Sequence, residues 1–170
     1  MLKKNVEKAL NEQINAEMYS AYLYLSMASY FDAEGLDGFA NWMRIQFQEE
    51  QEHAMKIYHY VNERGGRVRL KAIDGPDTDW KSPQHVFEVT LKHEELVTSL
   101  ISKLVDLARK ESDHATDNFL QWFVAEQVEE ESTADSILGK VKRVGDKGNG
   151  IYMLDRELGA RVYTPPAEEE

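Results

Sequence analysis

The sequence predicts an all-α protein, a four-helix bundle with one long crossover and a short fifth helix. Two observations support this fold class. Apolar residues recur in steps of three and four along four long stretches, which is the spacing of one face of an α-helix. Turn signals group these stretches into two pairs, and residues 67–81 between the pairs have no helical period and are long enough to span a bundle. The 170 residues, 42% of them hydrophobic, suggest a single domain over 1–170.

Local signals delimit each expected helix. Gly35 is a glycine stop for the first helix, and Asp37 is expected to cap the second. The third begins at Ser82-Pro83, a capping residue followed by proline in the first turn, and Asp113 starts the fourth after a break. We expect helices over residues 5–34, 37–64, 83–111, 113–144 and 151–158, and a frayed tail over 163–170.

Six polar side chains interrupt the apolar stripes at positions that face the core. A shift of 77 residues carries three of them onto the other three, which indicates two related helical hairpins. At about 1.5 Å per residue, all six are expected at one level, about 22–27 Å from the turns. The first hairpin contributes Glu17, Glu50 and His53, and the second contributes Glu94, Gln127 and Glu130.

This convergence favours a metal site. Carboxylates that meet in a helical core cannot all stay ionised and unpaired, because burial and like charge both penalise the charged form. An oxygen-rich site with one imidazole suits a divalent cation, and carboxylates from two helices can bridge a pair of ions. Iron is the best candidate because the ligands include no sulfur, with manganese and zinc as alternatives. Without metal, the same residues would be partly protonated carboxyls bridged by Gln127, His53 and waters.

Further residues lie next to the six. Tyr24 follows Glu17 by seven residues on the same helical face, and is either an ordinary core aromatic or a redox or hydrogen-bonding partner. Three more glutamates form either a solvated face or a third ion site, and they are Glu49, Glu126 and Glu129.

The composition excludes several classes of function. A formal net charge of −11 argues against nucleic acid as a partner and suits a protein that attracts cations. The absence of cysteine excludes disulfides, Cys-based zinc sites and iron–sulfur clusters, and fits a reducing cytosol. We find no signal-like apolar segment and no apolar run as long as a membrane span, so we expect a cytoplasmic protein without membrane partners.

The chain resembles the ferritins, specifically the haem-free bacterial and archaeal type. The resemblance covers nearly the whole chain and rests on the motifs Asn15-x-Glu17-x-Tyr19-Ser20, Glu50-x-x-His53 and Leu154-Asp155-x-Glu157-Leu158. It implies that Glu17, Glu50 and His53 hold one iron, and that Glu50 bridges to a second iron held by Glu94 and Glu130.

The resemblance also implies roles for the neighbouring residues. Gln127 is expected to hydrogen-bond near bound oxygen or water, with Tyr24 and Trp122 beside the centre. The third iron site would be formed by Glu49, Glu126, Glu129 and Glu130. Haem is not expected, because haem-binding relatives have a second Glu-x-x-His where this chain has Gln127-x-x-Glu130, and a Met where it has Gln51.

The function that the resemblance implies is iron storage and detoxification. A ferroxidase would oxidise Fe(II) to Fe(III) with O2 or H2O2 and deposit ferric oxyhydroxide inside a hollow shell of 24 copies. Two rivals remain at this stage. One is a peroxidase-like di-iron oxidoreductase without storage, and the other is a helical bundle with a purely structural role.

Overall fold

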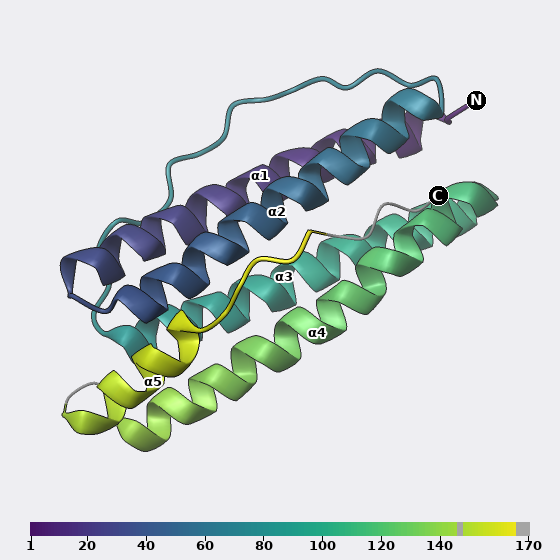
Figure 1. Ribbon diagram of the computed structural model, residues 1–170. Helices are drawn as coiled ribbons and strands as arrows, with labels where there is room; N and C mark the ends of the chain where they lie inside the picture. Colours follow the sequence, from purple (N-terminus) through teal and green to yellow (C-terminus); the bar gives the residue numbers. More distant parts are fainter. Residues whose placement is uncertain (146–147, 166–170) are drawn as a thin grey trace.

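The structure is a computed structural model that describes residues 1–145 and 148–165. These residues contain five α-helices. They are α1 (Lys4–Ala33), α2 (Asp37–Glu63), α3 (Pro83–Lys110), α4 (His114–Val144) and α5 (Asn149–Gly159). The pairs α1/α2 and α3/α4 form two hairpins, and the crossover between them runs along the outside of the first hairpin (Figure 1). The predicted all-α bundle with a long crossover and a short fifth helix is confirmed.

The observed helix bounds lie within two residues of the expected ones. Ser82 caps α3 as predicted, since its hydroxyl accepts a hydrogen bond from the backbone N–H of His85 at 3.2 Å, with Pro83 as the first helical residue. Gly35 adopts a positive φ of 71° in the turn between α1 and α2, a conformation that glycine tolerates and most residues avoid.

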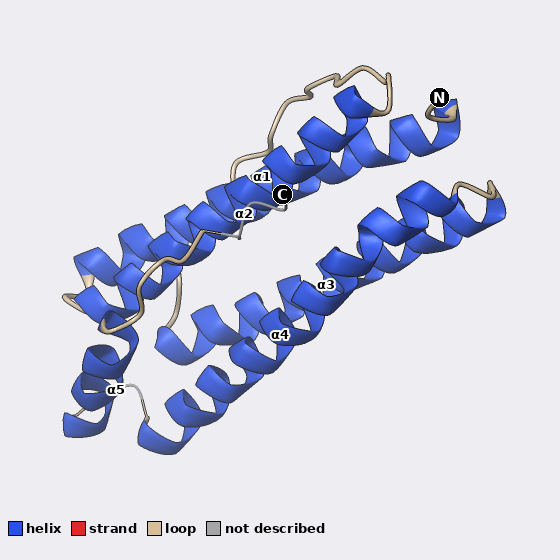
Figure 2. Ribbon diagram, turned by 45° about the vertical axis from the view of Figure 1, so that its right-hand side comes forward, coloured by secondary structure: helices blue, strands red, loops and turns tan. Residues whose placement is uncertain are grey.

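The expected cap of α2 is wrong, and the actual cap comes from α5. Asp37 is already helical, and Leu36 at the cap position makes no side-chain hydrogen bond. Instead, Oδ1 of Asp155 accepts the backbone N–H groups of Gly38 and Phe39, at 2.8 and 3.0 Å. A Cβ atom on Gly38 would lie 1.7 Å from the backbone carbonyl oxygen of Asp155, so only glycine fits this approach. The contact fixes α5, which lies steeply inclined across one end of the bundle, against α2 (Figure 2).

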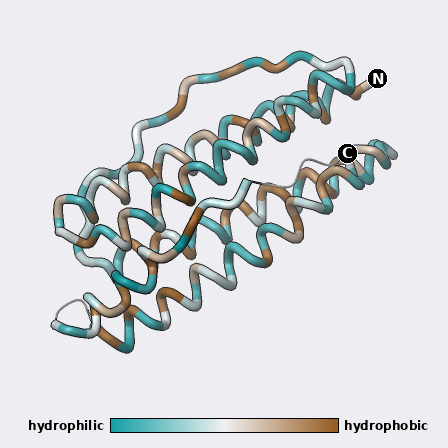
Figure 3. The backbone as a smooth tube through the Cα atoms, in the orientation of Figure 1, coloured by the Kyte–Doolittle hydropathy of each residue, from teal (hydrophilic) through white to brown (hydrophobic). Residues whose placement is uncertain are grey.

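The buried apolar residues form two separate cores along the bundle. The first core lies next to α5 and contains Phe31, Phe39 and Phe87, whereas the second core lies toward the opposite end and contains Leu10 and Ile57. Apolar and polar segments alternate along the long helices, as expected for helices with one buried face (Figure 3). The six polar core residues fall between the two cores in the sequence of each helix, and they form a polar layer there.

The segment after α5 turns back along the bundle toward its middle (Figure 1). The Asn41 side chain donates a hydrogen bond to the backbone carbonyl of Arg161 at 3.0 Å, and the Arg161 guanidinium lies 5.0 Å from the ring centre of Trp42. The segment thus packs on α2, and Thr164 lines a cavity there. Residues 163–165, where the expected frayed tail begins, have no regular secondary structure. Residues 166–170 of that tail lie outside the described residues. No helix in residues 1–145 and 148–165 is long and apolar enough to cross a membrane.

Candidate metal centre

A buried group of three potential metal ligands lies in the polar layer. Glu17 from α1 and Glu50 and His53 from α2 each offer one ligand atom, and these atoms lie within 4.8 Å of one another. Gln13, one turn before Glu17, donates a hydrogen bond to its Oε1 at 2.9 Å. Oε2 of Glu17 and Oε2 of Glu50 are buried and have no hydrogen-bond partner among the described residues. Two such oxygens beside an imidazole fit a divalent cation, because buried carboxylate oxygens otherwise require donors.

Glu94 on α3 is held by neutral hydrogen-bond donors from two other helices. The hydroxyl of Tyr24 donates to its Oε1, and Nε2 of Gln127 donates to its Oε2 at 3.2 Å. The same Nε2 lies 3.3 Å from the hydroxyl oxygen of Thr98. Both carboxylate oxygens of Glu94 are therefore oriented by these donors, and each keeps a lone pair that could bind a cation.

Glu130 on α4 is oriented by a residue that the sequence analysis did not assign to the site. Nε2 of Gln46 donates a hydrogen bond to Oε2 of Glu130 at 2.9 Å, and Oε1 of Gln46 accepts one from the Arg161 guanidinium. The Gln46 side chain thus links Arg161, in the segment after α5, to Glu130 in the polar layer. The ligand atoms of Glu94 and Glu130 lie outside the group of Glu17, Glu50 and His53 whose ligand atoms are within 4.8 Å of one another.

Burial and mutual repulsion raise the pKa values of the carboxyl groups. Burial, reinforced by the charge of Glu50, raises the pKa of Glu17 to about 8. Burial also raises the pKa of Glu130 to about 7, with repulsion from Glu94 as the next cause. The pKa of Glu50 is raised well above its ordinary value by burial and then by Glu94 and Glu130, and burial raises that of Glu94 as well. The metal-free layer therefore holds protons at neutral pH, and a bound cation would displace them.

The Tyr24 phenol stays protonated in this environment. Burial, and then the charge of Glu94, raises the pKa of Tyr24 well above its ordinary value of 10. The phenol therefore keeps its proton at neutral pH and donates a hydrogen bond to Oε1 of Glu94. The ring of Trp122 packs edge-on against the imidazole of His53, with 5.4 Å between ring centres, which restricts the imidazole orientation.

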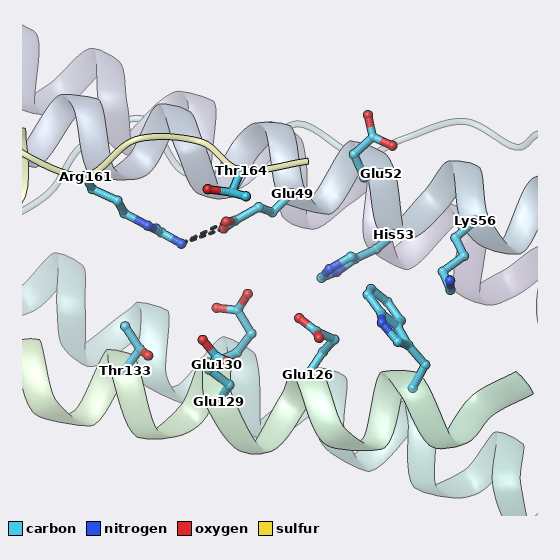
Figure 4. A pocket seen from close by; sticks show the side chains of 11 residues that line it. Glu49, Glu52, His53, Lys56, Glu126, Glu129, Glu130, Thr133, Arg161 and Thr164 are labelled. Atoms are coloured by element: carbon cyan, nitrogen blue, oxygen red, sulfur yellow. Dashed lines mark hydrogen bonds and ion pairs between the residues drawn. The ribbon is translucent and has the colours of Figure 1, made fainter. Parts of the chain in front are cut away.

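A cavity of about 420 Å³ lies beside the polar layer, between α2, α4 and the segment after α5. In Figure 4, His53 from α2 points into the space toward which Glu126 and Glu130 from α4 also point. Glu130 is buried, Glu126 is half-buried and Glu129 is exposed. The cavity brings together all four residues expected at a third ion site, and its acidic lining consists of Glu49, Glu52, Glu126, Glu129 and Glu130.

Arg161, which the sequence analysis missed, pairs with Glu49 in this cavity. Its Nη2 lies 2.9 Å from Oε1 and 2.7 Å from Oε2 of Glu49. Burial raises the pKa of the Glu49 carboxyl, and Arg161 acts in the opposite direction. No periodic signal identified Arg161, because it follows a helix end and its partners are more than a hundred residues away in the sequence. Gln46 was visible in the apolar stripe of α2, but its link to Glu130 depends on the packing of α4.

Known proteins resemble this chain over nearly its whole length. A family model described as a ferritin-like domain matches residues 7–144. The chain is 48% identical over 161 residues to the bacterial non-heme ferritin of Bacteroides fragilis strain 638R, covering 95% of this chain and all of that one. It is 42% identical over 163 residues to the bacterial non-heme ferritin of Staphylococcus aureus strain USA300, covering 96% and 98% of the two chains.

Solved structures are similar over the same length. The open pore ferritin of the hyperthermophilic archaeon Archaeoglobus fulgidus superposes with a TM-score of 0.94 and is 54% identical, covering 95% of this chain and all of that one. A closed form of the same ferritin, engineered by site-directed mutagenesis, superposes with a TM-score of 0.95 at 54% identity, covering 96% of this chain and all of that one.

Proposed function

Because the chain belongs to the ferritin family, we propose that it stores iron, by oxidising Fe(II) in its polar layer and depositing Fe(III) mineral inside a hollow shell of 24 copies. One observation carries the chemical part of this proposal. Glu17 and Glu50 each present a buried carboxylate oxygen without a hydrogen-bond partner beside His53, and an Fe(II) ion would satisfy both. We further propose that the protein is cytoplasmic and binds no haem.

Iron is the substrate of the proposed reaction. Glu17, Glu50 and His53 bind one Fe(II), and Glu50 is shared with a second Fe(II) that Glu94 and Glu130 bind. Each Fe(II) gives up one electron, and dioxygen takes both electrons and two protons to form hydrogen peroxide. When H2O2 is the oxidant, the same two electrons and two protons yield water. Placing two Fe(II) side by side is what lets one oxidant collect a pair of electrons.

The surrounding residues prepare the carboxylates for this exchange. Gln13, Gln46 and Gln127 each hold one carboxylate by a neutral hydrogen bond, so they orient it without competing with the cation through positive charge. The raised pKa values mean that Fe(II) binding releases protons from Glu17 and its neighbours. Carboxylates that are protonated in the empty layer do not repel one another enough to open the bundle.

The test starts from purified apoprotein loaded anaerobically with Fe(II). Air is then admitted while ultraviolet absorbance reports Fe(III) formation, and gel filtration and electron microscopy size the product. We expect fast oxidation of more than two irons per chain in hollow particles with an electron-dense core. Two irons in a small oligomer without a core would favour the non-storage oxidoreductase, and no metal binding would refute both.

Two variants connect the reaction to the polar layer. His53→Ala and Glu130→Ala should each slow the fast phase of oxidation by at least about tenfold, because each removes a side chain that binds Fe(II). The control is Glu34→Ala, which removes an exposed carboxylate at the end of α1 and should leave the rate unchanged. Unchanged initial rates in both site variants would refute the assignment of the oxidation site.

A further inference from the structure

The segment after α5 brings a positive charge into the acidic cavity and anchors it at several points. The Arg161 guanidinium makes two hydrogen bonds to the carboxylate of Glu49 through one nitrogen and donates to Gln46 through another. It also stacks over Trp42, and the backbone carbonyl of Arg161 accepts a hydrogen bond from Asn41. The Arg161 and Glu49 side chains are only 28% and 23% exposed, so the pair is largely removed from solvent.

This ion pair occupies oxygens that an incoming cation would need. One guanidinium nitrogen donates to both carboxylate oxygens of Glu49, so a cation that binds Glu49 competes with these hydrogen bonds and with the Arg161 charge. Glu126 and Glu130 point into the same space from α4 (Figure 4). Arg161 therefore lies where it partly neutralises an acidic cavity, and its charge opposes the approach of a second cation.

The same guanidinium is also linked to the buried polar layer through one amide. Oε1 of Gln46 accepts from Arg161, and Nε2 of Gln46 donates to Oε2 of Glu130. Because a carboxamide has its acceptor and its donors on opposite sides, Arg161 fixes which side of Gln46 faces Glu130. Arg161 thus contacts the outer carboxylate directly and positions the inner one through Gln46.

We propose that Arg161 is a tethered counter-ion that pairs with the Glu49 carboxylate until Fe(II) replaces it, and that this replacement frees residues 160–165 from α2. Arg161 is therefore a positioning residue, because cation binding at Glu49 changes how the segment after α5 is held on α2. The inference rests on the proposed function, since Fe(II) is the cation that enters the cavity. Only the protein's own residues and the arriving cation take part in the exchange.

The test measures binding of Zn(II), a redox-inactive divalent cation, to the assembled apoprotein by isothermal titration calorimetry. Arg161→Met removes the charge but keeps an unbranched stem over Trp42, and it should tighten Zn(II) binding about two- to fivefold, the upper part of the range for a partly exposed ion pair. In a Glu49→Gln background the same substitution should have less than a twofold effect, because the pair is already broken. No tightening, or equal tightening in both backgrounds, would overturn the proposal.

A matched control separates competition from general electrostatics. Lys56 also lines the cavity, but its ammonium lies 4.6 Å from the ring centre of Trp122. Lys56→Met removes the same amount of charge and should change Zn(II) affinity less than twofold. A change as large as that of Arg161→Met would overturn direct competition in favour of a nonspecific charge effect.

A second measurement needs no variant. In the wild-type protein, Zn(II) should speed amide hydrogen exchange at residues 160 and 161 several-fold. Their N–H groups donate to the carbonyls of Glu157 and Leu158, and the segment loses the Arg161–Glu49 pair that holds it on α2. Unchanged or slower exchange would refute the release. This inference alone would be overturned if the wild-type protein oxidises Fe(II) fast and the Arg161 variants bind Zn(II) as the wild type does. If no sample oxidises Fe(II), the proposed function would be overturned as well.

Discussion

Replacing Glu17 by glutamine should stabilise the metal-free protein, and it should do so more at pH 8 than at pH 5. Glu17 is 1% exposed, and its pKa is raised from 4.5 to about 8. Between these two values the unfolded chain loses this proton while the folded chain keeps it, so the free energy of unfolding falls as pH rises. At about 1.4 kcal/mol per pKa unit, the loss reaches at most about 5 kcal/mol above pH 8.

Glutamine removes this loss because it cannot ionise. It retains an oxygen to accept the hydrogen bond from Gln13. Its amide nitrogen can donate to Oε2 of Glu50, which has no hydrogen-bond partner among the described residues and lies 3.4 Å from Nδ1 of His53. We therefore expect Glu17→Gln to raise the free energy of unfolding by several kcal/mol at pH 8 and by less than about 1 kcal/mol at pH 5.

The assay is thermal denaturation of the metal-free protein, followed by circular dichroism at one protein concentration and at both pH values. Glu34→Gln is the control, since this carboxylate is exposed and its replacement should leave the melting temperature unchanged at both pH values. Equal stabilisation by Glu17→Gln at pH 5 and pH 8, or destabilisation at pH 8, would refute the claim that a buried proton governs this part of the stability.

Further predictions concern α5 and the tyrosine beside the centre. Gly38→Ala should lower the free energy of unfolding by about 3 kcal/mol or more through the clash with Asp155, whereas Gly139→Ala, with no atom nearer than 3.5 Å, should be neutral or stabilising by up to about 1 kcal/mol in the same melts. Asp155→Ala should cost about 1–2 kcal/mol because two N–H groups of α2 lose their acceptor, and proteolysis after α4 should become faster. Tyr24→Phe should cost about 1–2 kcal/mol in denaturant titrations, because Glu94 loses a buried donor, and an unchanged stability would contradict the role given to this hydrogen bond.

The parts of the fold that were predictable from the sequence are those governed by local repetition. Helix length and direction follow from apolar spacing and from end signals such as Gly35 and Ser82, and both depend on neighbours a few residues away. The prediction of a polar layer rested on the same spacing, since residues at equal distances from two turns must lie at one level of a bundle.

The parts that the sequence analysis missed depend on contacts between distant segments. Asp37 has the residue type of a helix cap, but the carboxylate of Asp155 occupies that place after α5 folds back. Arg161 follows a helix end without any periodic pattern, so nothing in its neighbourhood indicates that it reaches Glu49. Such contacts become visible only when the packing of the helices is known.

The apolar interior of the bundle is divided into two cores, with the polar layer between them. Phe31 and Phe39 lie in the core at one end, and Leu10 and Ile57 lie in the core at the other. Each core packs residues of all four long helices together. Substitutions in the polar layer between them leave both of these apolar cores in place. A bundle built this way can change its reactivity over evolutionary time, through substitutions at a single level, while keeping its architecture.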